Sequence, residues 1–197
     1  TKPLREIVRA GESVAIIISD ITRLCGTKEF LPVIVEELNS VGVKDEDITV
    51  VVATGTHRGH THEEDITVCG EEMVRRLRII QHDSRKKEDM VSLGKTSFGN
   101  EVAINKYVAN ADRVILTGAV TLHPFAGFGG GRKAVMPGVA AYDSIMLNHC
   151  MTMSPVEGGG CNKACDASLL EGNPIHQDMK ESAALLDPDF LLNTVFT

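Results

Sequence analysis

The segment Val14-Ala-Ile-Ile-Ile-Ser19 is apolar at consecutive positions, which predicts a β-strand with both faces buried. A second run of the same kind covers Ile48–Ala53. Between the two runs, residues 28–41 carry apolar side chains at helical spacing and predict an amphipathic helix. Two buried strands joined by a helix normally pair in parallel through a right-handed crossover. These stretches therefore predict the centre of a parallel sheet.

The alternation of strands and helices continues along the chain. Further helices are expected at 63–77 and 102–110, and further strands at 77–81 and 113–116. The glycine- and cysteine-containing stretch 151–166 is expected to be a loop. The pattern predicts one α/β domain over 1–197, a doubly wound, mainly parallel Rossmann-like sheet with helices on both faces.

Composition excludes several classes of protein. The 197 residues are 43% hydrophobic and 24% charged, which is ordinary for one globular domain. A net charge of -7 argues against a nucleic-acid partner, and no apolar run approaches the roughly 20 residues of a membrane span. Five irregularly spaced cysteines and an N-terminus without a signal peptide predict a reduced, cytoplasmic protein. The strand-like run 188–197 at the end suggests that a C-terminal domain is absent from this chain.

Polar side chains follow four of the predicted strands at the point where each strand ends. Asp20 and Arg23 follow the first strand, His57 the second, His82 the third and His123 the fourth. Ligands of open parallel sheets bind beyond the carboxyl ends of the strands. We therefore expect an active site at this edge. His82-Asp83 could be an oriented acid–base pair, but a solvated charged loop is the simpler interpretation, because Arg85-Lys-Lys87 follows.

The segment His123-Pro-Phe-Ala-Gly-Phe-Gly-Gly-Gly-Arg-Lys133 is the most unusual in the sequence. Its glycines allow the backbone to approach a ligand closely, and freed N–H groups can hold a phosphate or carboxylate. The order of residues is neither that of a Walker loop nor that of a dinucleotide-binding fingerprint. Lys133 is a candidate nucleophile or phosphate partner. The alternative is a flexible surface loop with a solvated Arg-Lys pair.

The other histidines have both structural and functional interpretations. His57 is a candidate catalytic residue, but a histidine at a strand end is often only hydrogen-bonded structure. His60 and His62 are expected to be solvated residues that lead into a helix, and no spacing of further ligands completes a zinc site with them. His149 lies in a stretch, 141–149, that could be helical, and it could be a core or interface histidine.

Taken together, the motifs resemble the nickel-dependent lactate racemases. The resemblance extends from about residue 20 to residue 178. It rests on Asp20-Ile-Thr-Arg23, Thr54-Gly-Thr-His57-Arg58, the glycine-rich segment His123–Lys133 with Ala-Val-Met-Pro-Gly138 after it, Asn148-His149 and Gly172-Asn-Pro174.

The resemblance implies a cofactor and its attachment. Enzymes of this family carry a nickel-pincer nucleotide, pyridinium-3,5-bisthiocarboxylic acid mononucleotide, in which nickel is held by one carbon and two sulfurs. The lysine that matches Lys133 is joined to this cofactor through a thioamide, and the histidine that matches His149 is the fourth nickel ligand. Gly129, Gly130 and Gly131 are expected to lie against the cofactor.

The resemblance also implies catalytic roles. The histidines that match His57 and His123 act as general acid–bases, one for each enantiomer, while hydride leaves the substrate Cα for the pyridinium ring and returns to the other face. Arg23 is the candidate contact of the substrate carboxylate. Asp20 is expected at the cofactor side of the site, orienting a neighbouring base or lysine.

The expected function is racemisation of lactate or another 2-hydroxy acid, with the cofactor supplied by separate maturation enzymes. The chain alone is expected to be inactive, because family members contribute substrate contacts from a second domain. Two alternatives remain at this point. One is an enzyme for a phosphorylated ligand, and the other is a non-catalytic nucleotide-binding module, both using the glycine-rich loop without nickel.

Overall fold

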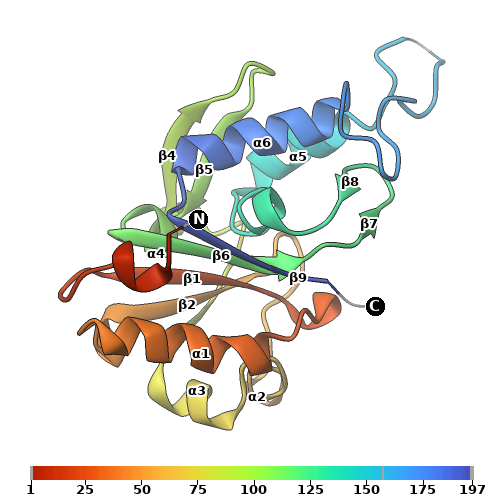
Figure 1. The fold of residues 1–197 in the computed structure, drawn as a ribbon. Coiled ribbons are helices and arrows are strands. Elements are labelled where there is room, and N and C mark those ends of the chain that lie inside the picture. The colour runs from red at the N-terminus through yellow and green to blue at the C-terminus, as the bar shows by residue number, and fades with distance from the viewer. Residues whose placement is uncertain (1, 157, 196–197) are drawn as a thin grey trace.

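The computed structural model, which describes residues 2–156 and 158–195, is built around a five-stranded sheet (Figure 1). All neighbouring strands in this sheet are parallel, in the order β3-β2-β1-β6-β9. The strands are β1 (Val14–Ser19), β2 (Ile48–Ala53), β3 (Arg78–Gln81), β6 (Arg113–Ala119) and β9 (Phe190–Thr194). The predicted mainly parallel α/β fold is therefore confirmed.

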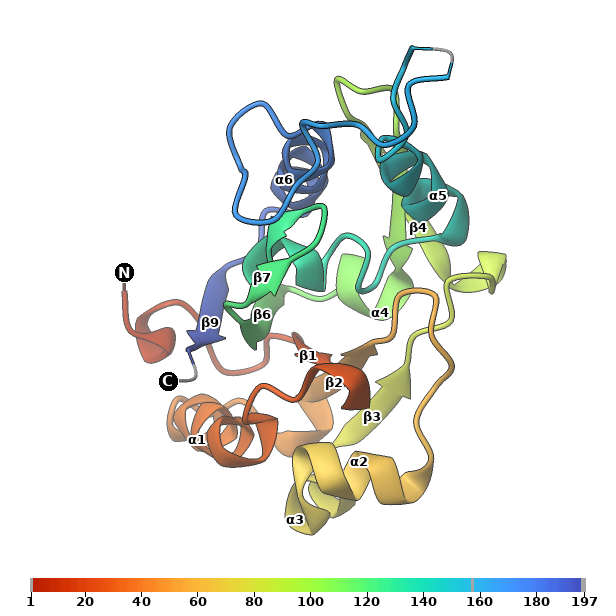
Figure 2. The ribbon, with the colours of Figure 1, turned by 90° about the vertical axis from the view of Figure 1, so that its right-hand side faces the viewer.

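Two layers cover the sheet (Figure 2). One layer contains α1 (Thr27–Ser40), α2 (His62–Cys69) and α3 (Glu71–Arg76), and the other contains α4 (Lys106–Ala109), α5 (Tyr142–Cys150) and α6 (Pro174–Leu186). Two small antiparallel sheets lie on the α5–α6 side, formed by β4 (Met90–Lys95) with β5 (Glu101–Asn105), and by β7 (Leu122–His123) with β8 (Gly127–Phe128). The 3-10 turns are η1 (Leu4–Glu6), η2 (Ile21–Arg23), η3 (Asp45–Asp47), η4 (Lys87–Asp89) and η5 (Gly131–Ala134).

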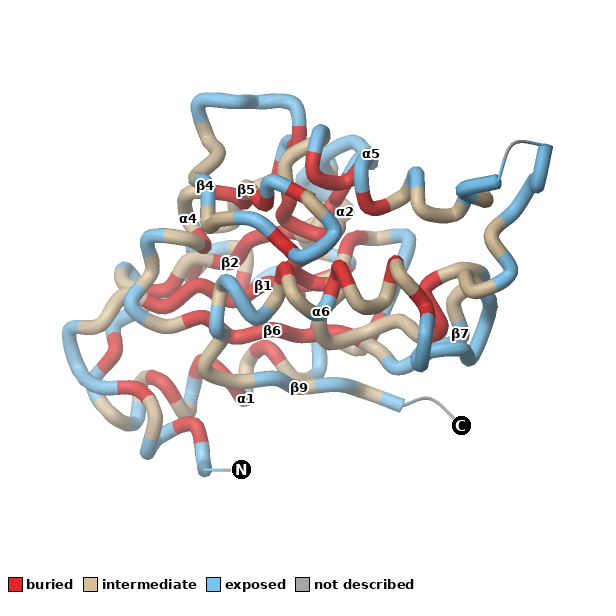
Figure 3. Tube along the Cα trace, turned by 90° about the horizontal axis from the view of Figure 1, so that it is seen from above, coloured by how far each residue is buried: buried red, intermediate tan, exposed pale blue. Residues whose placement is uncertain are grey.

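Strand β1 shows why the consecutive apolar pattern predicts a central strand. Val14, Ile16 and Ile18 pack in the core on the α1 side, while Ala15 and Ile17 pack in the core on the α5–α6 side. Each of these side chains is at most 1% exposed. Figure 3 shows the same continuous burial along the central strands. Because side chains alternate between the two faces of a strand, burial on both faces requires an apolar residue at every position.

Two predicted helices have different boundaries in the structure. The helix expected at 63–77 is divided into α2 and α3 by Gly70, whose φ of 85° lies in the region that favours glycine. The prediction of a helix at 102–110 is wrong for residues 102–105. There, β5 pairs antiparallel with β4 and buries the alternate residues Val102 and Ile104, and only the turn after Asn105 is helical.

The C-terminal third contains elements that the sequence pattern did not assign. Helix α6 begins at Asn173, whose side chain accepts hydrogen bonds from the N–H groups of Ile175 and His176. Within the strand-like run 188–197, residues Phe190–Thr194 form the edge strand β9, and residues 196–197 lie outside the described residues. Within residues 2–156 and 158–195, no helix is both long and apolar enough to cross a membrane.

His82 follows β3, as expected, but it is a core residue. Its side chain is 1% exposed, and Nε2 lies 2.9 Å from the Ala140 carbonyl oxygen, to which it donates. The Asn105 amide donates to Nδ1 at 3.3 Å. Burial lowers the pKa of His82, so the ring is neutral in the folded protein at pH 7. The solvated-loop interpretation of His82 is therefore wrong.

We predict that His82 contributes to a loss of stability in mild acid. In the unfolded chain His82 takes up a proton as the pH falls through about 6.5, whereas the folded protein resists this protonation. The free energy of unfolding should therefore fall below pH 6.5, by at most about 1.4 kcal/mol per pH unit for this one group. Urea titrations between pH 7 and 5 should give a shallower pH dependence for His82→Gln, and His62→Gln, at an exposed position, should follow the parent protein. Equal slopes for all three would contradict this assignment.

Candidate active site

A cavity of about 600 Å³ lies at the carboxyl edge of the sheet. The ends of β1, β2 and β6 form its floor, and the loop after β6, η5 and α5 form its walls. Its volume is suitable for a small molecule or cofactor. Three of the four predicted strand ends therefore meet here. The fourth does not, because His82 is turned into the core.

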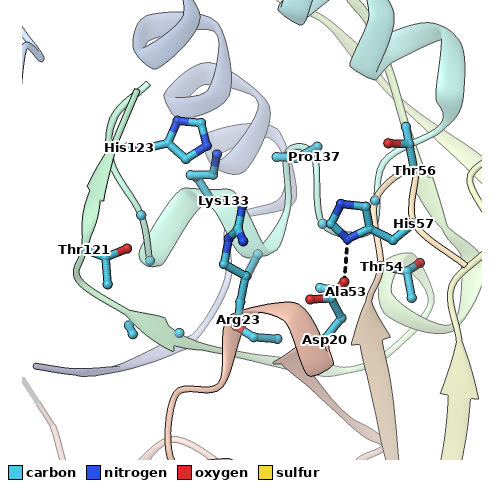
Figure 4. Close-up of a pocket in the computed structure, with 18 of the residues that line it drawn as sticks. Asp20, Arg23, Ala53, Thr54, Thr56, His57, Thr121, His123, Lys133 and Pro137 are labelled. Carbon is cyan, nitrogen blue, oxygen red and sulfur yellow. Dashed lines mark hydrogen bonds and ion pairs between the residues drawn. The ribbon is translucent and has the colours of Figure 1, made fainter. Parts of the chain in front are cut away.

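Asp20 and His57 form a hydrogen-bonded pair at this edge (Figure 4). Asp20 is 4% exposed, and its Oδ1 accepts from the N–H and hydroxyl of Thr22. Its Oδ2 lies 2.6 Å from His57 Nδ1. A carboxylate at Nδ1 holds the proton of a neutral imidazole on that nitrogen. His57 Nε2 is then left with a free lone pair and can accept a proton.

His123 approaches the cavity from β7, on the opposite side from His57 (Figure 4). Its Nδ1 accepts the N–H of Ala126 at 3.3 Å, so the neutral ring carries its proton on Nε2. Burial, followed by the nearby charges of Lys133 and Arg23, lowers the pKa of His123 to about 4. The two histidines therefore differ in protonation. Nε2 of His57 has a lone pair, whereas Nε2 of His123 carries a proton.

Lys133 lies in η5 and lines the cavity. Burial, followed by the charges of Arg132 and Arg23, lowers the pKa of its amine to about 8. Its Nζ lies 5.9 Å from the centre of the Phe125 ring. A desolvated amine with a lowered pKa has a larger unprotonated fraction at neutral pH and is a better nucleophile.

The glycine-rich loop is packed against the ends of β6 and β9. A Cβ at Gly130, whose φ is 73°, would lie 2.7 Å from Asn193 Oδ1 and 2.9 Å from the Ala119 carbonyl oxygen. Gly129 and Gly130 line the cavity, whereas the N–H of Gly131 donates to Asn193 Oδ1 at 3.1 Å. The interpretation as a flexible surface loop is therefore wrong, because these glycines allow close backbone packing.

His149 lies in α5 and also lines the cavity, with the helix that the sequence allowed at 141–149 observed at Tyr142–Cys150. Its Nδ1 donates to the carbonyl oxygen of Ile145 at 3.0 Å, which leaves the Nε2 lone pair free. Burial, followed by the charge of Lys133, lowers the pKa of His149 and favours the neutral ring that a metal requires. No group of three or more metal-ligating side chains occurs within residues 2–156 and 158–195. A metal on His149 would therefore need ligands from a bound molecule.

Positive charge dominates the described lining of the cavity. Arg23 and Lys133 both contribute cations, and Arg132 lies close enough to lower the pKa of Lys133. Asp20 is the one carboxylate among the described lining residues, and its oxygens are already bonded to Thr22 and His57. This arrangement favours an anionic ligand such as a carboxylate or phosphate.

His60, which the sequence predicts to be solvated, has a buried side chain. Its side chain is 1% exposed and bonds to the backbone of Ile21 and to Asp65. His62, expected to be solvated as well, is exposed at the start of α2. The local sequence around His60 and His62 contains no pattern that would show which of the two side chains is buried.

We predict that removal of the Lys133 charge raises the pKa of His123. In Lys133→Met the value should rise above about 4 but stay below 6.5, because burial is the larger cause and remains. Titration of the histidine ring signals by NMR in the full-length protein measures this shift. Lys180→Met, at an exposed position on α6, is the matched control. An unchanged value in Lys133→Met would show that the two groups are not coupled.

Comparison with known proteins agrees with the sequence motifs. Residues 1–160 match the family model for the lactate racemase N-terminal domain. The chain is 35% identical to the lactate racemase of Thermoanaerobacterium thermosaccharolyticum over 195 residues and 39% identical to that of Lactiplantibacillus plantarum over 194 residues. These alignments cover 99% and 98% of this chain but only 44% of each relative.

Solved structures show the same relationship. The structure of the lactate racemase apoprotein from T. thermosaccharolyticum matches with a TM-score of 0.89 and 34% identity, over 100% of this chain and 46% of that one. A protein from Thermotoga maritima shares the fold, with a TM-score of 0.74 and 18% identity over 98% of this chain and 49% of that one. On these matches, the chain belongs to the lactate racemase N-terminal domain family.

Proposed function

We propose that this chain is the cofactor-holding part of a racemase that acts on lactate or a related 2-hydroxy acid. The observation that carries the proposal is one cavity that contains the desolvated amine of Lys133, the free Nε2 of His149, and two histidines on opposite sides. The lactate racemase activity named for the two relatives supports this choice of reaction.

The residues present suit a nickel-pincer nucleotide. Lys133 offers a nucleophilic amine for a thioamide link, and His149 offers one neutral nitrogen ligand, oriented by the Ile145 carbonyl. The cofactor would supply carbon and sulfur donors to the metal, and one neutral nitrogen from His149 would complete a donor set that suits nickel. Gly129 and Gly130 line the cavity near Lys133, and the absence of a Cβ lets their backbone pack closely against Ala119.

The side chains around the cavity then have separate roles in racemisation. Arg23 binds the substrate carboxylate through its guanidinium group. The bound cofactor supplies reversible acceptance of the substrate Cα hydrogen as hydride. His57, oriented by Asp20, takes the hydroxyl proton from one enantiomer at Nε2. His123 takes it from the other enantiomer once its own proton has moved from Nε2 to Nδ1 and the ring has released the Ala126 N–H. Return of the hydrogen to the opposite face, with return of a proton to oxygen, inverts the centre.

The proposal includes partners that lie beyond this chain. Both lactate racemases are more than twice as long as the matched region, and we propose that a further domain completes the substrate site, so that this chain alone is inactive. Maturation enzymes would make and load the cofactor. Free cysteines at all five positions agree with a reduced, cytoplasmic setting.

The cationic cavity also suits a phosphorylated ligand, which is the second candidate function. Arg23 and Lys133 could neutralise a phosphate without any metal. In that case Lys133 stays unmodified and nickel does not bind. The two candidates therefore differ in the chemical state of one residue.

We predict that Lys133 carries the cofactor in the full-length protein coexpressed with maturation enzymes. Intact-mass and peptide analysis should find an adduct on Lys133, and metal analysis should find about one nickel per chain. Lys133→Ala should lose the adduct, whereas Lys180→Ala should keep it. An unmodified Lys133 in a preparation whose parallel control, a known lactate racemase, is fully loaded would favour the phosphorylated-ligand alternative.

We also predict that His57 and His123 serve opposite enantiomers. His57→Gln and His123→Gln should each lower racemisation roughly 100-fold or more, because each removes one proton acceptor. In single turnovers with pure L- or D-lactate, acid quenching should release pyruvate from only one enantiomer for each variant, and from opposite ones for the two variants. If both variants fail to release pyruvate from the same enantiomer, these roles are wrong.

A further inference from the structure

His60 is buried outside the cavity and makes three hydrogen bonds. Its Nε2 accepts the backbone N–H of Ile21 at 2.8 Å, and its Nδ1 lies 3.0 Å from Asp65 Oδ1. Its own N–H donates to Gln81 Oε1 at 3.0 Å, and the Gln81 amide donates to Asp65 Oδ1 at 2.9 Å. The imidazole therefore joins the turn after β1 to helix α2, and the backbone N–H of His60 adds a bond to the end of β3.

These contacts fix the protonation of the His60 ring. The Ile21 N–H can only donate, so Nε2 of His60 must present a lone pair. The proton of the neutral ring is then on Nδ1, where it donates to Asp65. An asparagine or a solvated histidine at position 60 would not make the Ile21 contact.

Ile21 is the first residue of η2, the short turn that carries two groups of the cavity. Asp20 precedes the turn and bonds to His57, and Arg23 ends it and lines the cavity. The turn has one internal backbone bond, from the Arg23 N–H to the Asp20 carbonyl oxygen at 2.9 Å. Short 3-10 turns have poor internal hydrogen bonding, so the turn needs support from outside. His60 supplies that support from the opposite side of the peptide.

We propose that His60 is a positioning residue, which holds η2 through the Ile21 N–H and so places Asp20 against His57 and Arg23 toward the cavity. Its effect on catalysis rests on the proposed racemase function, whereas its effect on the His57–Asp20 hydrogen bond does not. Outer residues that orient site groups typically change activity about 10- to 100-fold when replaced.

Two substitutions separate the contacts of the His60 ring. His60→Gln can place an amide oxygen near the position of Nε2 and keep an acceptor for the Ile21 N–H. His60→Asn is one bond shorter, so it can reach Asp65 but leaves the Ile21 N–H without its partner. His62→Asn, at the exposed position two residues on, is the matched control. All variants are made in the full-length protein and loaded with cofactor.

Two measurements are made on each variant. NMR of protein labelled with ¹⁵N-histidine reports which nitrogen of His57 and His60 is protonated and whether the Nδ1 proton of His57 stays in its hydrogen bond. Steady-state racemisation gives kcat, which depends on the orientation of His57, and KM, which depends on Arg23. A residue that only stabilises the fold would leave the His57 signal in place in every folded variant.

The parent protein should show Nδ1-protonated rings at both His57 and His60. His60→Asn should weaken or remove the NMR signal of the His57 Nδ1 proton and lower kcat/KM about 10- to 100-fold. His60→Gln should keep most of that signal and most of the parent kcat/KM. An unchanged His57 signal in folded His60→Asn, or a His60 ring protonated on Nε2, would overturn the proposal. If His60→Asn does not fold, the same comparison with Ile21→Pro, which removes the N–H that His60 accepts, decides. If the parent protein racemises nothing, the racemase proposal fails while the NMR comparison still decides the role of His60.

Discussion

The parallel pairing of β1 with β2 and β6 is the constraint on which the cavity depends. This pairing places Ser19 beside Ala53, so the residues that follow the two strands emerge side by side. Asp20 can then reach the ring of His57 across 37 positions of sequence. Because β6 continues past the point where its pairing with β1 ends, it directs the loop of His123 over the same edge. Apolar residues on both faces of β1 hold this register, and the reactive groups follow from it.

Hydrogen bonds to backbone groups and carboxylates set the state of each histidine around this edge. Asp20 leaves a lone pair on Nε2 of His57, the Ile145 carbonyl does the same for His149, and the Ala126 N–H keeps the proton of His123 on Nε2. The surrounding cations and burial keep His123 and His149 neutral and lower the pKa of Lys133 to about 8. The chain therefore provides positions, protonation states and charge, which suits a site whose difficult chemistry comes from a bound group.

Most of the central sheet could be predicted from the sequence, because strands buried on both faces leave a run of apolar residues that few other structures share. The β5 strand could not, since its alternating Val102 and Ile104 are too few to distinguish a strand from a helical turn. The location of His57 and His123 at the carboxyl edge of the sheet could be predicted, because each residue follows the end of a predicted strand. The burial of His60 and His82 did not, because it depends on partners such as Ile21 and Ala140 that are distant in sequence.

The most direct test of the account is the position of nickel in a crystal of the loaded, full-length protein. Anomalous diffraction at the nickel absorption edge locates the metal independently of any assumption about the cofactor. We expect one strong peak in the cavity, within coordination distance of His149 Nε2 and beside continuous density to Lys133 Nζ. A peak bound elsewhere, or a loaded protein whose nickel does not contact His149, would contradict the central claim.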